Sequence, residues 1–272
     1  MSDGAGGRAL IGYDRLLAVA RDEAGVLADS VAGARPEAII PGCPGLTLAE
    51  TARHVGSLYR MVRRWVWDGQ RPGEWQRDPA EGQDLADYVR AGIPPLIEEL
   101  SAHEPADRAP TWWPDDQTYG FWRRRMAHEA TVHRYDVQGA AGMVPAEVPE
   151  DVALDGIDEV LTLWFEHRLL VLGVAGTRDQ VVSVRAGGME WLARAGGDTG
   201  RTSTRRPGEG PVGAYENADA GNGAGAAHAV VSGSAMEVYL WLWGRRPDRV
   251  VQFDGNRDAI AQLWALLRLA TR

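Results

Sequence analysis

Four long stretches with the hydrophobic spacing of helices fill the first half of the chain, and they constrain the fold more than any other feature. Loops rich in proline and glycine separate them. The stretches are Tyr13–Gly33, Thr47–Asp68, Asp84–His103 and Thr118–Ala141. In the second stretch, Thr47 and Glu50 have the spacing of a capping box, which marks the start of a helix. Four helices in succession predict a four-helix bundle.

The second half has a different pattern. A fifth helix is expected over Pro149–Leu172, and after Gly176 the segments DQVVSVRA and MEWLARA have the composition of two strands joined by a glycine turn. From Gly196 to Ala227 the chain is rich in glycine, proline, asparagine and aspartate, so we expect a long loop that is mobile around residues 207–227. A strand, a helix, a strand and a helix then complete the chain, in HAVVSG, SAMEVYLWLWG, DRVVQFDG and RDAIAQLWALLRLA.

These elements predict an α+β protein of two domains. A four-helix bundle is expected over residues 1–148, a bridging helix over 149–175, and a small α+β domain over 176–272. The length of 272 residues agrees with two domains, each large enough to bury a hydrophobic core.

Composition restricts the partners and the cellular compartment. The formal net charge of 29 − 38 = −9 and the lack of a long basic tract argue against nucleic acid or an anionic membrane as a partner. The single cysteine, Cys43, excludes an intramolecular disulfide and a cysteine-rich zinc site, and no activating base is evident near it. The N-terminus lacks the apolar core of a signal peptide, and no apolar run has membrane length. We expect a soluble cytoplasmic protein that acts on small molecules, and composition does not predict its oligomeric state.

Glu129 and His133 are the clearest candidates for a functional site. Helical residues four apart lie on one face with their Cβ atoms about 5–6 Å apart, so one metal ion can bridge the two side chains. His128 and Glu129 resemble the start of the H-E-x-x-H motif of zinc proteases, but the second histidine comes one residue late. Only Glu129 and His133 therefore share a helix face.

His54, in the second predicted helix, is a plausible third ligand. Metal sites in bundles are assembled from side chains on facing helices, which is the arrangement that these residues require. A metal-bound histidine usually donates its other ring N–H to a neighbouring acceptor. Glu50 lies four residues before His54, and Asp136 lies three residues after His133, so we expect these carboxylates to fill that role.

The same residues also have ordinary structural explanations. A histidine on an apolar helix face is more often a core residue than a ligand, and Arg125, Glu129 and His133 could form a row of exposed ion pairs. We expect the basic run Arg123–Arg125 to be solvated on the surface of the bundle. Spacing alone leaves both alternatives open.

Tryptophan is unusually frequent, with 11 residues against 3 phenylalanines. Trp65 and Trp122 fall within helical patterns, and we expect them in the core. Trp112 and Trp113 lie in a loop flanked by prolines, where their rings could either pack in the core or line a pocket.

Three segments, in this order along the chain, resemble the mycothiol-dependent maleylpyruvate isomerase family. They are ETARHVGSL around His54, RRMAHEATVHRYD around Glu129, and LWLWGRRPDRVVQFDG near the C-terminus. The N-terminal half of that family belongs to the DinB-like metal-binding four-helix superfamily. The resemblance spans nearly the whole chain, and its order is more specific than any single motif.

This resemblance implies a zinc ion held by His54, Glu129 and His133, with an open position for water or a thiol. Two histidines and one carboxylate form a sensible catalytic zinc set on chemical grounds, although the facial triad of non-haem iron oxygenases uses the same ligands. In relatives an external thiol, usually mycothiol, is the nucleophile. A metal-bound thiol is deprotonated, and the thiolate is the reactive form.

The resemblance also implies that Arg245 has a functional role, although Arg246 beside it makes this assignment ambiguous. A fixed positive charge suits substrates that bear a carboxylate or form an enolate. The alternative is that an arginine after a helix end only complements the helix dipole.

Two classes of function follow from the sequence. The first is a zinc-dependent enzyme that adds mycothiol to an electrophilic small molecule, either as a thiol S-transferase or as a cis/trans isomerase. The second is a non-catalytic metal-binding or ligand-binding protein of the same fold. The sequence does not identify the substrate.

Overall fold

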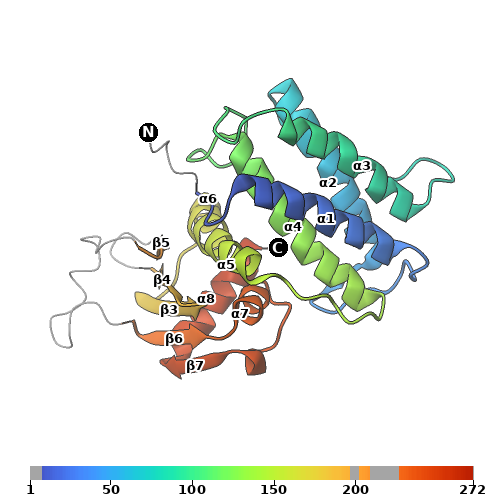
Figure 1. The fold of residues 1–272 in the computed structure, drawn as a ribbon. Coiled ribbons are helices and arrows are strands. Elements are labelled where there is room, and N and C mark those ends of the chain that lie inside the picture. The colour runs from blue at the N-terminus through green and yellow to red at the C-terminus, as the bar shows by residue number, and fades with distance from the viewer. Residues whose placement is uncertain (1–7, 197–201, 209–226, 272) are drawn as a thin grey trace. The chain divides into compact units, whose positions relative to one another are not determined.

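The structure, a computed structural model, describes residues 8–196, 202–208 and 227–271. The chain divides into two compact units, Met1–Val148 and Pro149–Arg272 (Figure 1). The helix expected to bridge two domains begins the second of these units, and the assignment of residues 149–175 as a separate segment stays a prediction. Among the described residues, no helix combines the length and the apolarity needed to cross a membrane.

Four helices build the first unit, close to the predicted positions. They are α1 (Tyr13–Val31), α2 (Leu48–Asp68), α3 (Leu85–Ser101) and α4 (Tyr119–Ala140). Three of them begin directly after a capping residue whose side chain accepts hydrogen bonds from backbone N–H groups of the first turn; these residues are Thr47, Asp84 and Thr118. Such caps satisfy N–H groups that have no partner inside the helix, which explains why the helix starts could be predicted.

The core of the first unit lies where these helices meet. α1 packs along α3 and α4, while α2 packs against α3 and α4. Trp65 of α2 and Trp122 of α4 meet edge to face, with ring centroids 5.3 Å apart, and both are buried as expected. Between α1 and α2 the chain forms a short antiparallel pair, β1 (Ile39–Ile40) and β2 (Cys43–Thr47), which the sequence did not predict.

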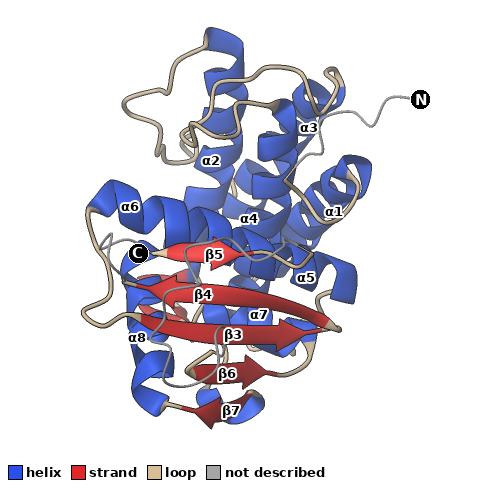
Figure 2. Cartoon of the chain, turned by 90° about the vertical axis from the view of Figure 1, so that its left-hand side faces the viewer, coloured by secondary structure: helices blue, strands red, loops and turns tan. Residues whose placement is uncertain are grey.

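The second unit contains one five-stranded sheet with the order β5-β4-β3-β6-β7 (Figure 2). The strands are β3 (Gln180–Ala186), β4 (Met189–Ala195), β5 (Ser203–Arg205), β6 (Ala229–Ser232) and β7 (Gln252–Gly255). β3 and β6 run parallel, and the other neighbouring strands are antiparallel. The tight turn between β3 and β4 uses Gly187 and Gly188, whose positive φ values of 53° and 75° suit residues without a Cβ.

Helices accompany this sheet and complete the predicted α+β fold. They are α5 (Glu150–Glu159), the π-helix η1 (Val160–Arg168), α6 (Leu169–Leu172), α7 (Ala235–Leu242), the 3₁₀ turn η3 (Asp248–Val250) and α8 (Arg257–Ala270). α7 and α8 both contact β3. The single helix predicted over residues 149–172 is present as one uninterrupted helical segment, but its middle part, Val160–Arg168, is a π-helix.

One expectation for this unit is wrong in part. β5 lies within the stretch from Gly196 to Ala227 that we predicted as a loop. Its neighbourhood explains the difference, because the hydroxyls of Thr202 and Thr204 donate to backbone carbonyls of η1, those of Phe165 and Leu161. These contacts come from residues far away in the sequence. Most of the predicted mobile loop, residues 209–226, lies outside the described residues.

Candidate metal centre

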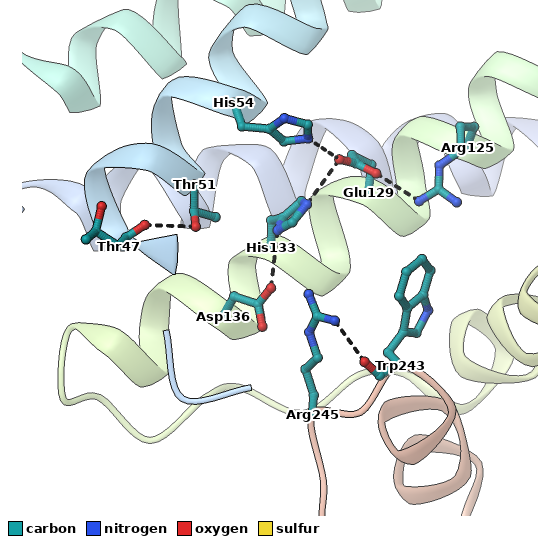
Figure 3. A network of polar contacts seen from close by, with 9 residues as sticks. All are labelled: Thr47, Thr51, His54, Arg125, Glu129, His133, Asp136, Trp243 and Arg245. Atoms are coloured by element: carbon teal, nitrogen blue, oxygen red, sulfur yellow. Dashed lines mark hydrogen bonds and ion pairs between the residues drawn. The ribbon is translucent and has the colours of Figure 1, made fainter. Parts of the chain in front are cut away.

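His54, Glu129 and His133 converge at one point of the first unit (Figure 3). Each offers one ligand atom, and the three atoms lie within 4.8 Å of one another. Nε2 of His54 lies 3.2 Å from Oε1 of Glu129, and Nε2 of His133 lies 3.1 Å from the same oxygen. Both imidazoles therefore direct the same ring nitrogen toward one carboxylate oxygen.

The helices place these side chains for simple reasons. Glu129 and His133 are one turn apart on the same face of α4, as their spacing predicts. His54 approaches from α2, which runs antiparallel to α4, since His54 meets Glu129 while Trp65 further along α2 meets Trp122. The side chains of Glu129 and His133 are 13% and 15% exposed, and that of His54 is 33% exposed. Solvent therefore reaches the cluster mainly on the side of His54.

The second ring nitrogen of His133 has the predicted partner. Nδ1 of His133 lies 3.2 Å from Oδ2 of Asp136, and Asp136 is almost fully buried. A buried carboxylate at this position fixes the orientation of the imidazole and leaves Nε2 directed at the cluster.

The expected partner of His54 is wrong. The carboxylate of Glu50 accepts hydrogen bonds from the backbone N–H and the hydroxyl of Thr47, so the capping box occupies it. Instead, the side-chain amide nitrogen of Gln76 lies 3.3 Å from Nδ1 of His54. The spacing between Glu50 and His54 is correct for contact, but the free N–H groups at the helix start bind the carboxylate first.

Gln76 and its neighbour Trp75 are site residues that the sequence analysis missed. The Trp75 ring lies edge-on to the His54 ring, with centroids 5.4 Å apart. The loop that carries both is fixed at Arg77, whose backbone N–H donates to the Ser57 hydroxyl at 3.0 Å and whose carbonyl accepts from that hydroxyl at 3.1 Å. No periodic pattern predicts a loop position of this kind.

The arginines of α4 are also not where we expected them. Arg123–Arg125 are buried, with exposures of 3–4%. The Arg123 guanidinium donates to the carbonyls of Leu100 and His103, which lie at and beyond the end of α3, and Nη2 of Arg125 lies 3.1 Å from Oε2 of Glu129. The ion pair of Arg125 and Glu129 is therefore a buried one, because α4 packs against several other helices of the bundle and its polar groups find partners inside it.

Charges around Glu129 fix its ionisation. Burial alone would raise its pKa, but the charge of His133, hydrogen bonds with both histidines and the charge of Arg125 together hold the pKa of Glu129 well below its usual range. Burial would likewise lower the pKa of His133, but Glu129 and Asp136 outweigh it and raise the pKa to about 9. Without a metal, the cluster is thus held together by a proton on His133.

Other sequence candidates lie elsewhere. His128 is fully buried and is not part of the cluster, which contains His133 instead. This agrees with the rejection of the zinc-protease motif in the sequence. Trp113 is buried and Trp112 half-buried, and both rings pack edge-on against Phe121, at centroid distances of 6.2 and 5.7 Å. These two tryptophans therefore belong to an aromatic cluster within the bundle.

Arg245 belongs to the second unit, in the turn that follows α7. Its Nη1 donates to the carbonyl of Trp243 at 2.8 Å, and its guanidinium lies 5.8 Å from the centre of the Trp243 ring. A functional role for Arg245 stays a prediction.

The part of the chain that contains the cluster matches a known protein family. Residues 17–138 match the family described as the mycothiol maleylpyruvate isomerase N-terminal domain. The match covers most of the first unit. The match contains all three residues of the cluster together with Asp136 and Gln76, and it confirms the resemblance that the sequence showed.

Solved structures extend the likeness to most of the chain. A crystal structure of the mycothiol-dependent maleylpyruvate isomerase has a TM-score of 0.55 at 12% identity, covering 90% of this chain and 93% of that chain. A histidine-to-alanine variant of the isomerase has a TM-score of 0.54 with the same identity and coverage. At this identity the comparison shows a shared fold. No curated protein matches the chain.

Proposed function

We propose that this protein is a zinc-dependent enzyme that uses a low-molecular-weight thiol, mycothiol, as a nucleophile toward an electrophilic small molecule. The observation that carries the proposal is the convergence of two imidazole nitrogens and one carboxylate oxygen within 4.8 Å. Two histidines and one carboxylate form the ligand set of several catalytic zinc sites, which keep a further position open. The domain that holds them matches a family named after the mycothiol maleylpyruvate isomerase.

The residues present fit a metal ion. His54 and His133 would bind through Nε2, and Glu129 would bind through Oε1, the oxygen that faces both histidines. Arg125 contacts the other oxygen of Glu129, and its charge adds to the larger effect of His133 in lowering the pKa of the carboxyl. Nδ1 of His133 faces the carboxylate of Asp136, an acceptor of the kind that a metal-bound histidine requires. Nδ1 of His54 lies near the amide nitrogen of Gln76, so Gln76 would have to turn its amide oxygen toward His54 when His54 binds a metal through Nε2.

The chain prepares the site for thiol chemistry. When bound, the metal supplies a thiol in its deprotonated, nucleophilic form at neutral pH. Asp136 holds His133 in one orientation, and Trp75 packs against the ring of His54 and restricts its motion. Arg245 is the residue that we propose to hold the negative charge of a substrate carboxylate or of an enolate.

Two reactions share this chemistry. In an isomerase the thiol adds to a conjugated double bond, the new single bond rotates, and the thiol is expelled, so no thiol is consumed. In an S-transferase the adduct is the product. The name of the similar solved structure favours isomerisation. Both reactions begin with the addition of the thiol, so the proposal includes both.

Metal content tests the ligand set. Purified wild type should contain about one zinc ion per chain, and His54→Ala should lose most of it, because three protein ligands are the usual number in a catalytic site. His103→Ala is the matched control, since His103 lies in the same bundle outside the cluster. A metal-free wild type, or equal zinc in wild type and His54→Ala, would contradict the proposal.

Product analysis tests the thiol reaction. The zinc-loaded protein is mixed with mycothiol and a panel of electrophiles that includes maleylpyruvate, and mass spectrometry follows adducts and isomers. An adduct that accumulates indicates an S-transferase, whereas an isomer formed without loss of thiol indicates an isomerase. No turnover above the metal-free protein would favour the second candidate, a non-catalytic metal-binding protein. Arg245→Ala should lower turnover and leave the zinc content unchanged.

A further inference from the structure

The loop of residues 69–84, which joins α2 to α3, contributes two contacts to the candidate metal centre. Its Trp75 and Gln76 lie against the ring of His54. The loop contains no helix or strand, and within the described residues its positions 70–79 make no backbone–backbone hydrogen bond. Gln76 itself is exposed to solvent. Contacts other than regular backbone pairing must therefore hold these two side chains at His54.

Ser57 of α2 and Tyr88 of α3 supply that support from the buried side of the loop. The Ser57 hydroxyl accepts from the backbone N–H of Arg77 at 3.0 Å and donates to the Arg77 carbonyl at 3.1 Å. The Tyr88 hydroxyl donates to the same carbonyl at 3.2 Å and lies 2.9 Å from the Ser57 oxygen. Both side chains are buried. Buried hydroxyls thus bind both backbone groups of Arg77, the residue that follows Gln76.

The Ser57 hydroxyl does not bond within its own helix. A helical serine can bond the carbonyl four residues earlier, as Ser30 of α1 does with the carbonyl of Val26 at 2.7 Å. Ser57 binds the loop instead, and it lies three residues after His54, on the same side of α2. The point at which the loop is fixed is therefore next to the histidine that the loop contacts.

Tyr88 is itself held firmly. Its ring packs where Gly56 has no side chain, and the Arg60 guanidinium lies 4.1 Å from the ring centre and donates to the Tyr88 carbonyl at 2.9 Å. The loop also forms an ion pair between Arg53 and Asp78 at 3.1 Å, but Asp78 is exposed, and exposed pairs contribute little. The firm attachment of the loop is therefore the buried one.

We propose that Ser57 is a positioning residue for the metal centre, and that it acts through the loop by keeping Gln76 within hydrogen-bond distance of His54. The amide of Gln76 can present either its nitrogen or its oxygen to Nδ1 of His54, while the anchor at Arg77 stays in place. Tyr88 supports the same anchor. This inference rests on the proposed role of His54 as a metal ligand, because a partner that orients a ligand ring raises metal affinity.

Zinc affinity of the full chain tests the positioning role. Ser57→Ala should weaken zinc binding about fivefold in competition with a chelating dye, less than the roughly tenfold typical of removing a partner itself. Tyr88→Phe keeps the ring, removes only the hydroxyl and should weaken binding in the same direction. Ser30→Ala is the matched control, since Ser30 is a buried serine of the same bundle that bonds its own helix, and its zinc affinity should equal that of wild type. An affinity of Ser57→Ala equal to that of wild type would overturn the proposal.

A double-mutant cycle shows whether Ser57 acts through Gln76. Gln76→Ala alone should weaken zinc binding about tenfold. In that background Ser57→Ala should have almost no further effect, because the side chain that the anchor positions is already absent. A general loss of bundle stability would instead add to the effect of Gln76→Ala. Additive effects on zinc affinity would therefore overturn the proposal.

A measurement made without metal separates this inference from the proposed function. Hydrogen exchange of the Arg77 amide, followed by NMR in the metal-free chain, reports on the bond to the Ser57 hydroxyl. The amide should exchange faster in Ser57→Ala than in wild type and Ser30→Ala. Equal exchange in wild type and Ser57→Ala would overturn the anchor. A wild type that binds no zinc but shows this difference would contradict the proposed function and not the anchoring of the loop by Ser57.

Discussion

Glu129 is the residue on which the candidate site depends. Its carboxylate is buried and meets three groups that carry or can carry a proton, which are His54, His133 and Arg125. A buried carboxylate without such partners would become neutral and would lose its value as a ligand. The arrangement keeps it charged and concentrates opposite charge around it, so any cation that replaces the proton on His133 enters a prepared site.

Zinc binding should therefore release a proton. The pKa of His133 is raised to about 9 in the metal-free protein, and a metal needs the neutral imidazole. Below this pKa a proton competes with zinc for His133, so zinc affinity should rise with pH and level off above the pKa. Calorimetry in two buffers of different ionisation enthalpy should show about one proton released at pH 7 and almost none at pH 10. Equal release at both pH values would contradict the raised pKa.

Asp136 should contribute to metal affinity without touching the metal. Asp136→Asn keeps the size of the side chain but removes the charge that orients Nδ1 of His133, so zinc should bind about tenfold more weakly. Asp87→Asn removes an exposed carboxylate from α3 of the same bundle and serves as the control. A chelator competition assay measures both variants. Equal affinity in Asp136→Asn and wild type would show that the contact does not support the ligand.

Sequence spacing predicted the residues of this site that lie on helices and missed the others. Glu129, His133 and Asp136 follow from helical periodicity, and helix pairing brings His54 to them. Gln76 did not follow, because its place depends on how a loop folds back onto α2. The burial of Arg123–Arg125 also escaped prediction, since charged residues are buried only when partners exist, and those partners come from other helices.

The starts of the helices depend on local sequence signals, whereas two elements that the sequence did not predict depend on contacts between distant residues. Thr47, Asp84 and Thr118 bind backbone groups of their own helices, so a short sequence window contains the whole interaction. The π-helix η1 and strand β5 are different. They stabilise each other through the hydroxyls of Thr202 and Thr204, which lie about 40 residues away from their acceptors in the sequence.

The approach of α2 to α3 depends on Gly56. A Cβ atom there would lie 2.7 Å from the ring of Tyr88, and this ring is held by the Arg60 guanidinium 4.1 Å above it. Gly56→Ala should therefore introduce strain of about 1–3 kcal/mol, more than the gain of about 1 kcal/mol in helix propensity. Denaturant unfolding should show a less stable protein.

Gly25 provides the matched control for this prediction. It lies in the middle of α1, and a Cβ atom there would meet no other atom within 4 Å. Gly25→Ala should stabilise the protein by about 0.5–1 kcal/mol, because alanine has less backbone freedom to lose in a helix. If Gly56→Ala stabilised the protein as well, close packing at Gly56 would not be needed for the α2–α3 contact.

The two units of the molecule contribute different residues to the proposed chemistry. His54, Glu129 and His133, with their partners Asp136 and Gln76, all come from the first unit. The second unit supplies Arg245, for which we propose a role toward the substrate. Its fold agrees with the predicted α+β class, and the pattern of short strands and helices was enough to predict it.

Metal binding should therefore survive without the second unit. A protein of residues 1–148 keeps all four bundle helices and all five residues of the candidate centre, so it should fold and bind zinc as tightly as the full chain. Circular dichroism checks the helices, and chelator competition checks the affinity, with His54→Ala in the same fragment as the control. Thiol turnover should be lost, because Arg245 is absent. A folded fragment with much weaker zinc binding would mean that the second unit supports the centre, and a fragment that retains turnover would remove Arg245 from the proposed reaction.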